Sequence, residues 1–216
     1  MNHVILLHGF LSSGKSGKAT FLYEKFESNP DIHFHPFDFN PTPKDFEYMT
    51  VSGMINRLRQ YIIDQKIETC TLVGSSMGAL VALNYAHRFS DGHRFGSVEQ
   101  LLLLAPLLAY FFGSRDDQSA VPTDPDLVEM VQHYGFDQLL PLRAELDMDG
   151  LLYKKTVPPP APITIVHGRF DEVIPIQHSQ AYAAQYPDQV QLVETDSDHR
   201  LSDKLDLIWQ MMAQIL

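Results

Sequence analysis

The stretch TCTLVGSSMGALVALNYAHRF, residues 69–89, joins two apolar segments through a short Gly-Ser-Ser-Met-Gly turn. Its first part predicts a buried strand over 69–75, and the part after the turn predicts a largely buried helix over 77–89. Glycines stand two residues before and two residues after Ser76, where they allow neighbouring backbone to approach closely. The pattern therefore predicts a sharp strand-to-helix turn that holds the Ser76 side chain above the edge of a sheet.

Strand-like and helix-like segments alternate along most of the chain. The apolar runs are continuous, which indicates a parallel sheet that is covered by helices on both faces. We therefore expect an α/β fold, a three-layer α/β/α sandwich with about six mostly parallel strands. The other expected strands are 3–9, 31–39, 98–106, 161–168 and 190–195, and the other expected helices are 19–27, 51–64, 179–186 and 201–216.

Residues 107–157 interrupt this alternation between the fourth and the fifth expected strand. They contain an aromatic and aliphatic patch, an acidic loop and short helix-like pieces near 127–133 and 136–146, without a strand pattern. A stretch of this length inside a compact domain is usually a lid or a binding insertion. We expect one domain over 1–216 with a cap at about 107–157.

The composition restricts the classes of partner. The 216 residues suit a single buried core, and 16 Lys and Arg against 27 Asp and Glu give a formal net charge of −11. That charge argues against nucleic acids and anionic membrane surfaces as partners. The single cysteine, Cys70, can form no internal disulfide and fits a reducing compartment.

No segment has the pattern of a secretory signal or a membrane span. The N-terminal residues MNHVILLHG lack a basic region and a small-residue cleavage site. The longest apolar stretch, 101–113, contains Pro106 and is too short to cross a bilayer. We expect a cytoplasmic protein without a membrane span, and the sequence leaves its oligomeric state open.

The segment GFLSSGKS, residues 9–16, matches the phosphate-binding P-loop pattern and follows an apolar run. A P-loop enzyme also needs a carboxylate at the end of a neighbouring strand to hold Mg²⁺. The only candidate is Asp38, on a strand that carries two histidines and a proline. In this alternative the protein binds a nucleotide through Lys15; otherwise we expect Lys15 and Lys18 to be solvated.

Three side chains of a different chemistry follow three successive strands. Ser76 follows the third expected strand, Asp171 the fifth and His199 the sixth. The carboxyl ends of parallel strands meet at one edge of a sheet, so these side chains are expected to meet there. A histidine could take the proton of Ser76, and a carboxylate could hold the imidazole in the required tautomer. Asp196 and Asp198 remain alternatives for that carboxylate.

These residues resemble the pattern of α/β-hydrolases, where the triad runs in the order Ser, Asp, His. The chain is similar in particular to the small YqiA-like serine esterases, through HGFLSS at 8–13, VGSSMG at 73–78, DEV at 171–173 and His199. The expected strand over 3–9 already carries the His-Gly pair, so we expect the two usual leading antiparallel strands to be missing. The resemblance implies a minimal α/β-hydrolase fold with a cap or lid after the fourth strand.

The resemblance also implies the roles of individual groups. Ser76 is the nucleophile, Asp171 the acid and His199 the base, and the backbone N–H groups of Phe10 and Met77 form the oxyanion hole. The implied activity is cleavage of a carboxylic ester or thioester of a small molecule through an acyl-enzyme, without metal or cofactor. Thioesterase, C–C hydrolase and perhydrolase chemistry remain open on the same triad, as does a catalytically idle binding module.

The residues that would hold the substrate are less defined by pattern. His8 is expected to be structural, with a ring that bonds neighbouring loops. The aromatic patch after the fourth strand suits core packing and an acyl pocket equally well. The candidate pocket residues are Leu11, Leu107, Tyr110, Phe111, Phe112 and Val173.

Overall fold

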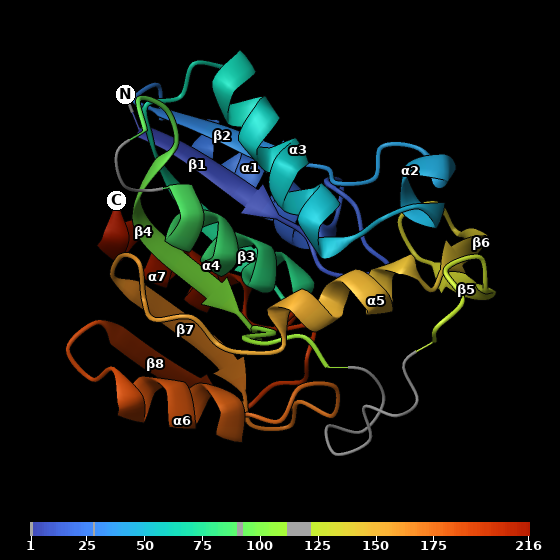
Figure 1. Cartoon of the computed structure of the whole chain (residues 1–216). Helices are drawn as coiled ribbons and strands as arrows, with labels where there is room; N and C mark the ends of the chain where they lie inside the picture. The colour runs from blue at the N-terminus through green and yellow to red at the C-terminus, as the bar shows by residue number, and fades with distance from the viewer. Residues whose placement is uncertain (1, 28, 90–92, 112–121) are drawn as a thin grey trace.

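The structure is a computed structural model that describes residues 2–27, 29–89, 93–111 and 122–216 (Figure 1). Within these residues six parallel strands form one sheet in the order β2-β1-β3-β4-β7-β8. Their bounds are β1 Asn2–Leu7, β2 Ile32–Phe37, β3 Thr69–Ser75, β4 Ser97–Leu104, β7 Ile163–Gly168 and β8 Val190–Thr195.

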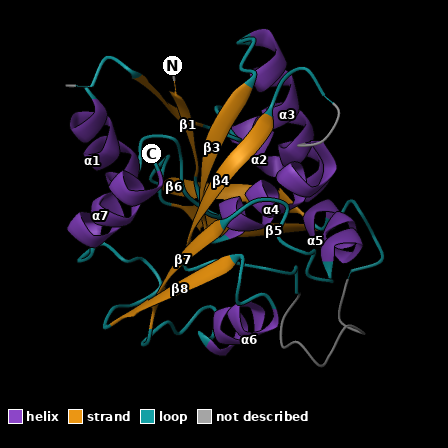
Figure 2. Ribbon diagram, turned by 90° about the vertical axis from the view of Figure 1, so that its left-hand side faces the viewer, coloured by secondary structure: helices purple, strands orange, loops and turns teal. Residues whose placement is uncertain are grey.

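Helices cover both faces of this sheet, as Figure 2 shows. Helices α1 (Gly17–Phe26) and α7 (Leu205–Ile215) pack on one face, and α3 (Val51–Asp64), α4 (Met77–Phe89) and α6 (Gln177–Gln185) lie on the other. Side chains of a strand point alternately to the two faces, so both sets must be apolar in a doubly covered sheet. This explains why the strands have continuous apolar runs.

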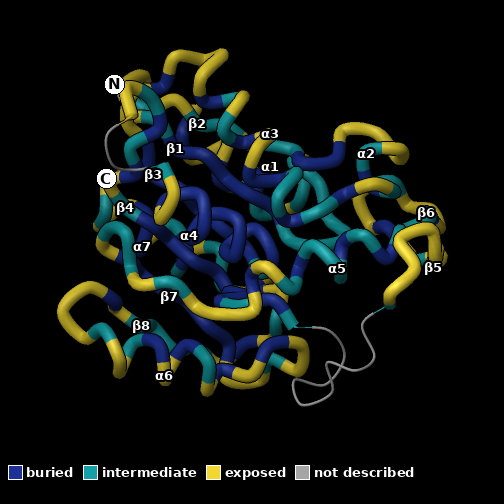
Figure 3. The backbone as a smooth tube through the Cα atoms, in the orientation of Figure 1, coloured by how far each residue is buried: buried dark blue, intermediate teal, exposed yellow. Residues whose placement is uncertain are grey.

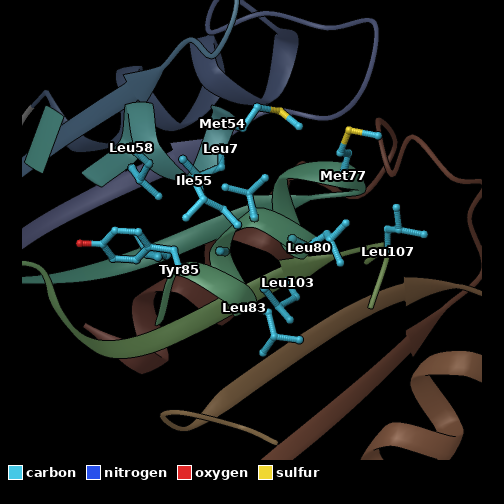
Figure 4. Packing of buried hydrophobic residues seen from close by; sticks show 14 of the residues in the cluster. Leu7, Met54, Ile55, Leu58, Met77, Leu80, Leu83, Tyr85, Leu103 and Leu107 are labelled. Atoms are coloured by element: carbon cyan, nitrogen blue, oxygen red, sulfur yellow. The ribbon is translucent and has the colours of Figure 1, made fainter. Parts of the chain in front are cut away.

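The two cores follow from this alternation. In β1, Val4 and Leu6 pack with α1 and α7, whereas Ile5 and Leu7 face the core of α3 and α4. Figure 4 shows side chains of α3 and α4 meeting those of the strands in this second core. Buried residues concentrate in the strands and in α4 (Figure 3), because α4 lies across the middle of the sheet.

The expected α/β sandwich is confirmed. The strand over 69–75, the helices over 51–64 and 77–89 and the strand over 190–195 have the bounds that their patterns predict. The short helix α2 (Pro43–Glu47) was not expected. It begins with a capping box between Thr42 and Asp45, which is a local sequence signal.

The helix-like interpretation of the insertion is wrong. Residues 127–133 and most of 136–146 form an antiparallel hairpin of β5 (Val128–His133) and β6 (Gln138–Arg143). Helix α5 (Glu145–Gly150) and the 3₁₀ helix η2 (Leu151–Tyr153) follow. Contacts between side chains of the two paired strands stabilise the hairpin. The spacing of apolar residues within one segment therefore did not decide between helix and strand.

The hairpin lies at the carboxyl end of the sheet, beyond α2 (Figure 1). Its strand β6 contacts α2, while β5 is largely exposed (Figure 3). The insertion after β4 therefore extends beside the sheet edge at which the candidate functional groups are expected. No helix in the described ranges is long and apolar enough to cross a membrane.

Candidate active site

Ser76 occupies a strained turn between β3 and α4. Its φ is +53°, in the left-handed region that non-glycine residues rarely adopt. The turn is held on both sides, because the Ser76 N–H donates to Leu104 O and the Leu107 N–H donates to Ser76 O. Such strain persists only where the surrounding structure enforces it, and it is typical of functional sites.

The two glycines beside Ser76 are required by close packing. A Cβ on Gly78 would lie 2.2 Å from Leu7 O, and a Cβ on Gly74 would lie 2.5 Å from Ala79 Cα. Neither distance is possible without movement of the backbone. The glycine spacing in the sequence therefore reflects a real requirement of this turn.

The structure brings Ser76, His199 and Asp171 into one hydrogen-bonded chain. His199 Nε2 lies 3.0 Å from Ser76 Oγ, and His199 Nδ1 lies 2.8 Å from Asp171 Oδ2. With Nδ1–H donating to the carboxylate, Nε2 is the ring atom that can accept the Ser76 proton. The His199 side chain is 20% exposed and that of Asp171 is fully buried. In this arrangement the Ser76 proton can pass to His199 Nε2, while the negative charge of Asp171 remains buried from solvent.

Asp171 is the carboxylate that contacts His199. Burial alone would raise its pKa, but hydrogen bonds from His167, His199 and the Ile174 N–H hold that pKa well below its usual range. Asp196 pairs with Arg169 at 2.7 Å instead. Asp198 Oδ1 accepts the N–H groups of the two residues that follow His199. Asp171 is therefore ionised at neutral pH, and the two alternatives stabilise the surrounding loops.

Two backbone N–H groups flank the Ser76 side chain. Met77 opens α4, so its N–H lies at the positive end of the helix dipole. Phe10 follows Gly9, where a Cβ would lie 3.2 Å from Ser76 Cβ, so the loop after β1 passes directly beside the serine. Among the described residues, no acceptor bonds the N–H of Phe10 or Met77. Both are free to bind a negatively charged oxygen.

His8 and Asp38 fix the loop that carries Phe10. The buried His8 ring bonds Gly9 O through Nδ1 and accepts the Phe39 N–H at Nε2, at 2.8 and 3.1 Å. Asp38 Oδ2 accepts the Gly14 N–H, and Asp38 Oδ1 lies 3.2 Å from His8 Nε2. Burial raises the pKa of Asp38, but His8 and neighbouring N–H groups lower it to about 2. His8 thus has the structural contacts that were expected of it.

The P-loop alternative does not match this loop. A P-loop presents its N–H groups to phosphate. Here the N–H groups of Ser12, Ser16 and Lys15 bond Gly9 O, Ser13 O and Ser13 Oγ. The Gly14 N–H bonds Asp38, which places a carboxylate where a phosphate would need cations.

Lys18 is only partly solvated, whereas full solvation was expected. Its Nζ donates to Arg200 O at 2.6 Å, and burial lowers its pKa. We refer to residues 196–201, which carry His199, as the histidine loop. Lys18 therefore connects α1 to the histidine loop, whereas Lys15 is exposed as expected.

The candidate pocket residues do not form one surface. Leu107 and Tyr110 are buried, Leu11 and Phe111 are half-buried, and Val173 is 59% exposed. Phe112 lies outside the described residues. Tyr110 and Phe111 line a cavity of about 570 Å³, together with Leu108, Ala109, Lys154, Lys155, Thr156, His178, Ala181, Tyr182 and Gln185.

A smaller void lies nearer to the candidate oxyanion hole. It is too narrow to hold a water molecule as it stands, and its walls include both Phe10 and Met77. Its walls also include His8 and Gly9 from the loop after β1, which the sequence patterns had indicated. The other four residues had no such signal: Phe39, Asn40 and Met49 come from the segment after β2, and Met54 comes from α3 (Met54 and, on α4, Met77 are labelled in Figure 4).

The insertion reaches both loops of the site. The Tyr134 N–H, at the tip of the hairpin, donates to Leu11 O at 3.0 Å, and the Arg200 guanidinium lies over the Tyr134 ring. Leu11 itself has a φ of +59°. The hairpin therefore contacts the loop beside Phe10 and the histidine loop at once.

Residues 3–215 match the model of a family described as Uncharacterised protein family (UPF0227). The chain belongs to the UPF0227 family. This match covers nearly the whole sequence and confirms the resemblance to the YqiA-like esterases. No curated protein sequence matches the chain.

Solved structures similar to this UPF0227 protein include several hydrolases. Mouse alpha/beta hydrolase domain-containing protein 10 has a TM-score of 0.75 and 21% identity, over 99% of this chain and 89% of its own. Est1E from Butyrivibrio proteoclasticus, with ferulic acid bound, has a TM-score of 0.72 and 17% identity over 99% and 89%. Paleococcus ferrophilus monoacylglycerol lipase has a TM-score of 0.73 and 16% identity, over 99% of this chain and 93% of its own. At these identities the likeness establishes the α/β-hydrolase fold.

Proposed function

We propose that this UPF0227 protein is a serine hydrolase that cleaves carboxylic ester or thioester bonds of small molecules. The observation that carries the proposal is the chain of hydrogen bonds from Asp171 through His199 to Ser76. It starts from a strained turn and lies beside two N–H groups without an acceptor among the described residues. Each group required for acyl transfer to a serine has a counterpart there.

In the first half of the reaction Ser76 Oγ attacks the carbonyl carbon while His199 Nε2 takes the serine proton. The carbonyl oxygen becomes negatively charged and accepts hydrogen bonds from the N–H groups of Phe10 and Met77. When this intermediate collapses, the bond to the leaving oxygen or sulfur breaks. The leaving group takes the proton from His199 Nε2, and the acyl group stays on Ser76.

In the second half a water molecule attacks the acyl carbon and gives its proton to His199. The bond between the acyl carbon and Ser76 Oγ breaks, Ser76 recovers the proton, and the carboxylic acid leaves. Asp171 remains ionised throughout and stabilises the charged imidazole, which fits its full burial and its lowered pKa. These steps use only groups of the chain and water.

The similar structures support this class of substrate. Est1E binds ferulic acid, a small carboxylic acid, and the Paleococcus protein is a monoacylglycerol lipase. The crevice between Phe10 and Met77 is too narrow for a water molecule as it stands, so it would receive the acyl part only after the flexible methionine side chains that line it move. We therefore propose small esters or thioesters, rather than nucleotides or polymers, as substrates.

The test is labelling with a fluorophosphonate probe followed by peptide mapping. We expect one adduct, on Ser76, which is lost in Ser76→Ala and retained in the control Ser75→Ala, one residue earlier in the same turn. Hydrolysis of p-nitrophenyl esters and of a thioester should depend on Ser76 in the same way. An adduct on another residue, or hydrolysis that survives Ser76→Ala, would overturn the proposal. Absence of labelling and turnover would favour an idle binding module.

A further inference from the structure

Asp171 contacts a second histidine that the reaction above does not use. His167, near the end of β7, is fully buried. Its Nε2 lies 3.1 Å from Asp171 Oδ2 and 3.0 Å from Ile174 O, and its Nδ1 lies 2.8 Å from Ser179 Oγ on α6. Both neighbours of Nε2 are acceptors, so Nε2 carries the proton and Nδ1 accepts from the Ser179 hydroxyl.

With this tautomer the Asp171 carboxylate has four donors. Oδ1 accepts the N–H groups of Val173 and Ile174 at 2.9 and 2.8 Å. Oδ2 accepts from His199 Nδ1 and His167 Nε2. A carboxylate offers about four lone-pair positions, so all of them are used. The carboxylate cannot rotate without breaking a buried hydrogen bond.

We propose that His167 is a positioning residue, which holds the Asp171 carboxylate in the orientation from which Oδ2 aligns the His199 ring toward Ser76. The inference rests on the proposed function, because it assigns a task within that site. His167 is not an alternative base: it is fully buried and both of its ring nitrogens already have partners inside the protein.

The His167 hydrogen bond also controls the charge on Asp171. A donor on Oδ2 shares the negative charge that would otherwise act on His199 alone. Without it, the carboxylate holds a protonated His199 more tightly and is free to turn. The β7–β8 register also places Glu194 beside His167, but Glu194 is paired with Arg169 at 3.2 Å. Asp171 is therefore the charge through which His167 acts.

Two substitutions separate the hydrogen bond from the volume of the side chain. His167→Leu removes the donor, whereas His167→Gln keeps an N–H at the position of Nε2. We expect His167→Leu to lower kcat about 10- to 100-fold with KM nearly unchanged, since misalignment of about 1 Å has effects of this size. The acidic limb of the kcat/KM profile should move to higher pH. His167→Gln should restore kcat to within a few-fold and return the limb to its wild-type position.

The matched control is Tyr182→Phe. Tyr182 lies on α6, as Ser179 does, and its buried hydroxyl donates to Val157 O without contact to Asp171. We expect Tyr182→Phe to lower thermal stability and leave the pH profile unchanged. If His167→Leu does not fold, Ser179→Ala serves instead, because it removes the partner that fixes the His167 tautomer. It should shift the profile in the same direction by a smaller amount.

A second measurement does not depend on turnover. The His199 Nδ1 proton, held by Asp171, should give a downfield proton resonance that weakens or moves in His167→Leu and returns in His167→Gln. If wild type neither labels nor hydrolyses esters, the proposed function fails while this resonance still tests the contact. A folded His167→Leu variant with wild-type kcat, pH profile and resonance would overturn the positioning role. So would effects no different from those of Tyr182→Phe.

Discussion

Replacement of Asp38 by asparagine should weaken the attachment of the loop that carries Phe10. Asp38 accepts the N–H groups of Gly14 and Asn40, at 3.1 and 2.9 Å, beside the His8 ring. In Asp38→Asn one carboxylate oxygen becomes an NH₂ group, which cannot accept from an N–H. The loop then loses a charge-assisted hydrogen bond and gains an unpaired donor.

The magnitude follows from the pKa of Asp38, which is about 2 in the folded protein against the ordinary value of 3.8. A tenfold difference in proton affinity between the folded and the unfolded chain corresponds to about 1.4 kcal/mol, so the ionised carboxylate contributes about 2 kcal/mol to the free energy of unfolding at neutral pH. Its side chain is 28% exposed, so solvent screens this contribution only in part. Because the folded pKa is the lower one, the contribution is complete above about pH 4 and is lost as the pH falls through about 2.

Urea denaturation of wild type and Asp38→Asn at pH 7, 4 and 2.5 measures this contribution. The difference should be about 2 kcal/mol at pH 7 and should shrink toward zero at the lowest pH. The control Asp31→Asn changes an exposed carboxylate just before β2 and should stay within about 0.5 kcal/mol of wild type. A difference below about 0.5 kcal/mol at pH 7, or one that is equal at every pH, would refute this account of the loop.

Three further changes test other parts of the structure. Gly78→Ala should unfold the turn or abolish labelling of Ser76, because the new Cβ would lie 2.2 Å from Leu7 O. The melting temperature and probe labelling of the variant measure these effects. A stable variant with full labelling would contradict the prediction. Burial and neighbouring histidines lower the pKa of His35 to about 4. As the pH falls, the unfolded chain therefore takes up a proton on His35 before the folded chain does. The free energy of unfolding of wild type should decrease by about 2 kcal/mol between pH 6.5 and 4, a value already reduced for solvent screening at this half-buried ring. Denaturant unfolding at several pH values measures this decrease. His35→Gln should remove this contribution to the pH dependence of the free energy of unfolding. An unchanged pH dependence in the variant would show that groups other than His35 cause it. Lys18→Met removes the hydrogen bond to Arg200 O, so it should loosen the histidine loop and lower kcat several-fold. Lys15→Met should leave kcat unchanged. Equal kcat values for the two variants would exclude this role of Lys18.

The insertion shows where sequence patterns failed. The segments near 127–133 and 136–146 have apolar spacings that suit short helices, yet most of their residues form the β5–β6 hairpin. Strand pairing depends on residues of the opposite strand and on the α2 surface beneath it, which local periodicity does not contain. The prediction that Lys18 is solvated failed for a related reason, because its partner Arg200 is 182 residues away in the sequence.

The parallel sheet, the turn at Ser76 and the edge at which Ser76, Asp171 and His199 meet all follow from local sequence patterns. Continuous apolar strands and strand-end polar residues are local signals, and parallel pairing gathers carboxyl ends at one edge without further information. How Asp171 is held depends on the tertiary structure, because His167 contacts its carboxylate and is itself bonded to Ser179 of α6. The bonds from four N–H groups of GFLSSGKS, those of Ser12, Gly14, Lys15 and Ser16, to Gly9, Ser13 and Asp38 depend on it likewise. Those contacts depend on the positions of side chains in space, which spacing along the chain does not specify.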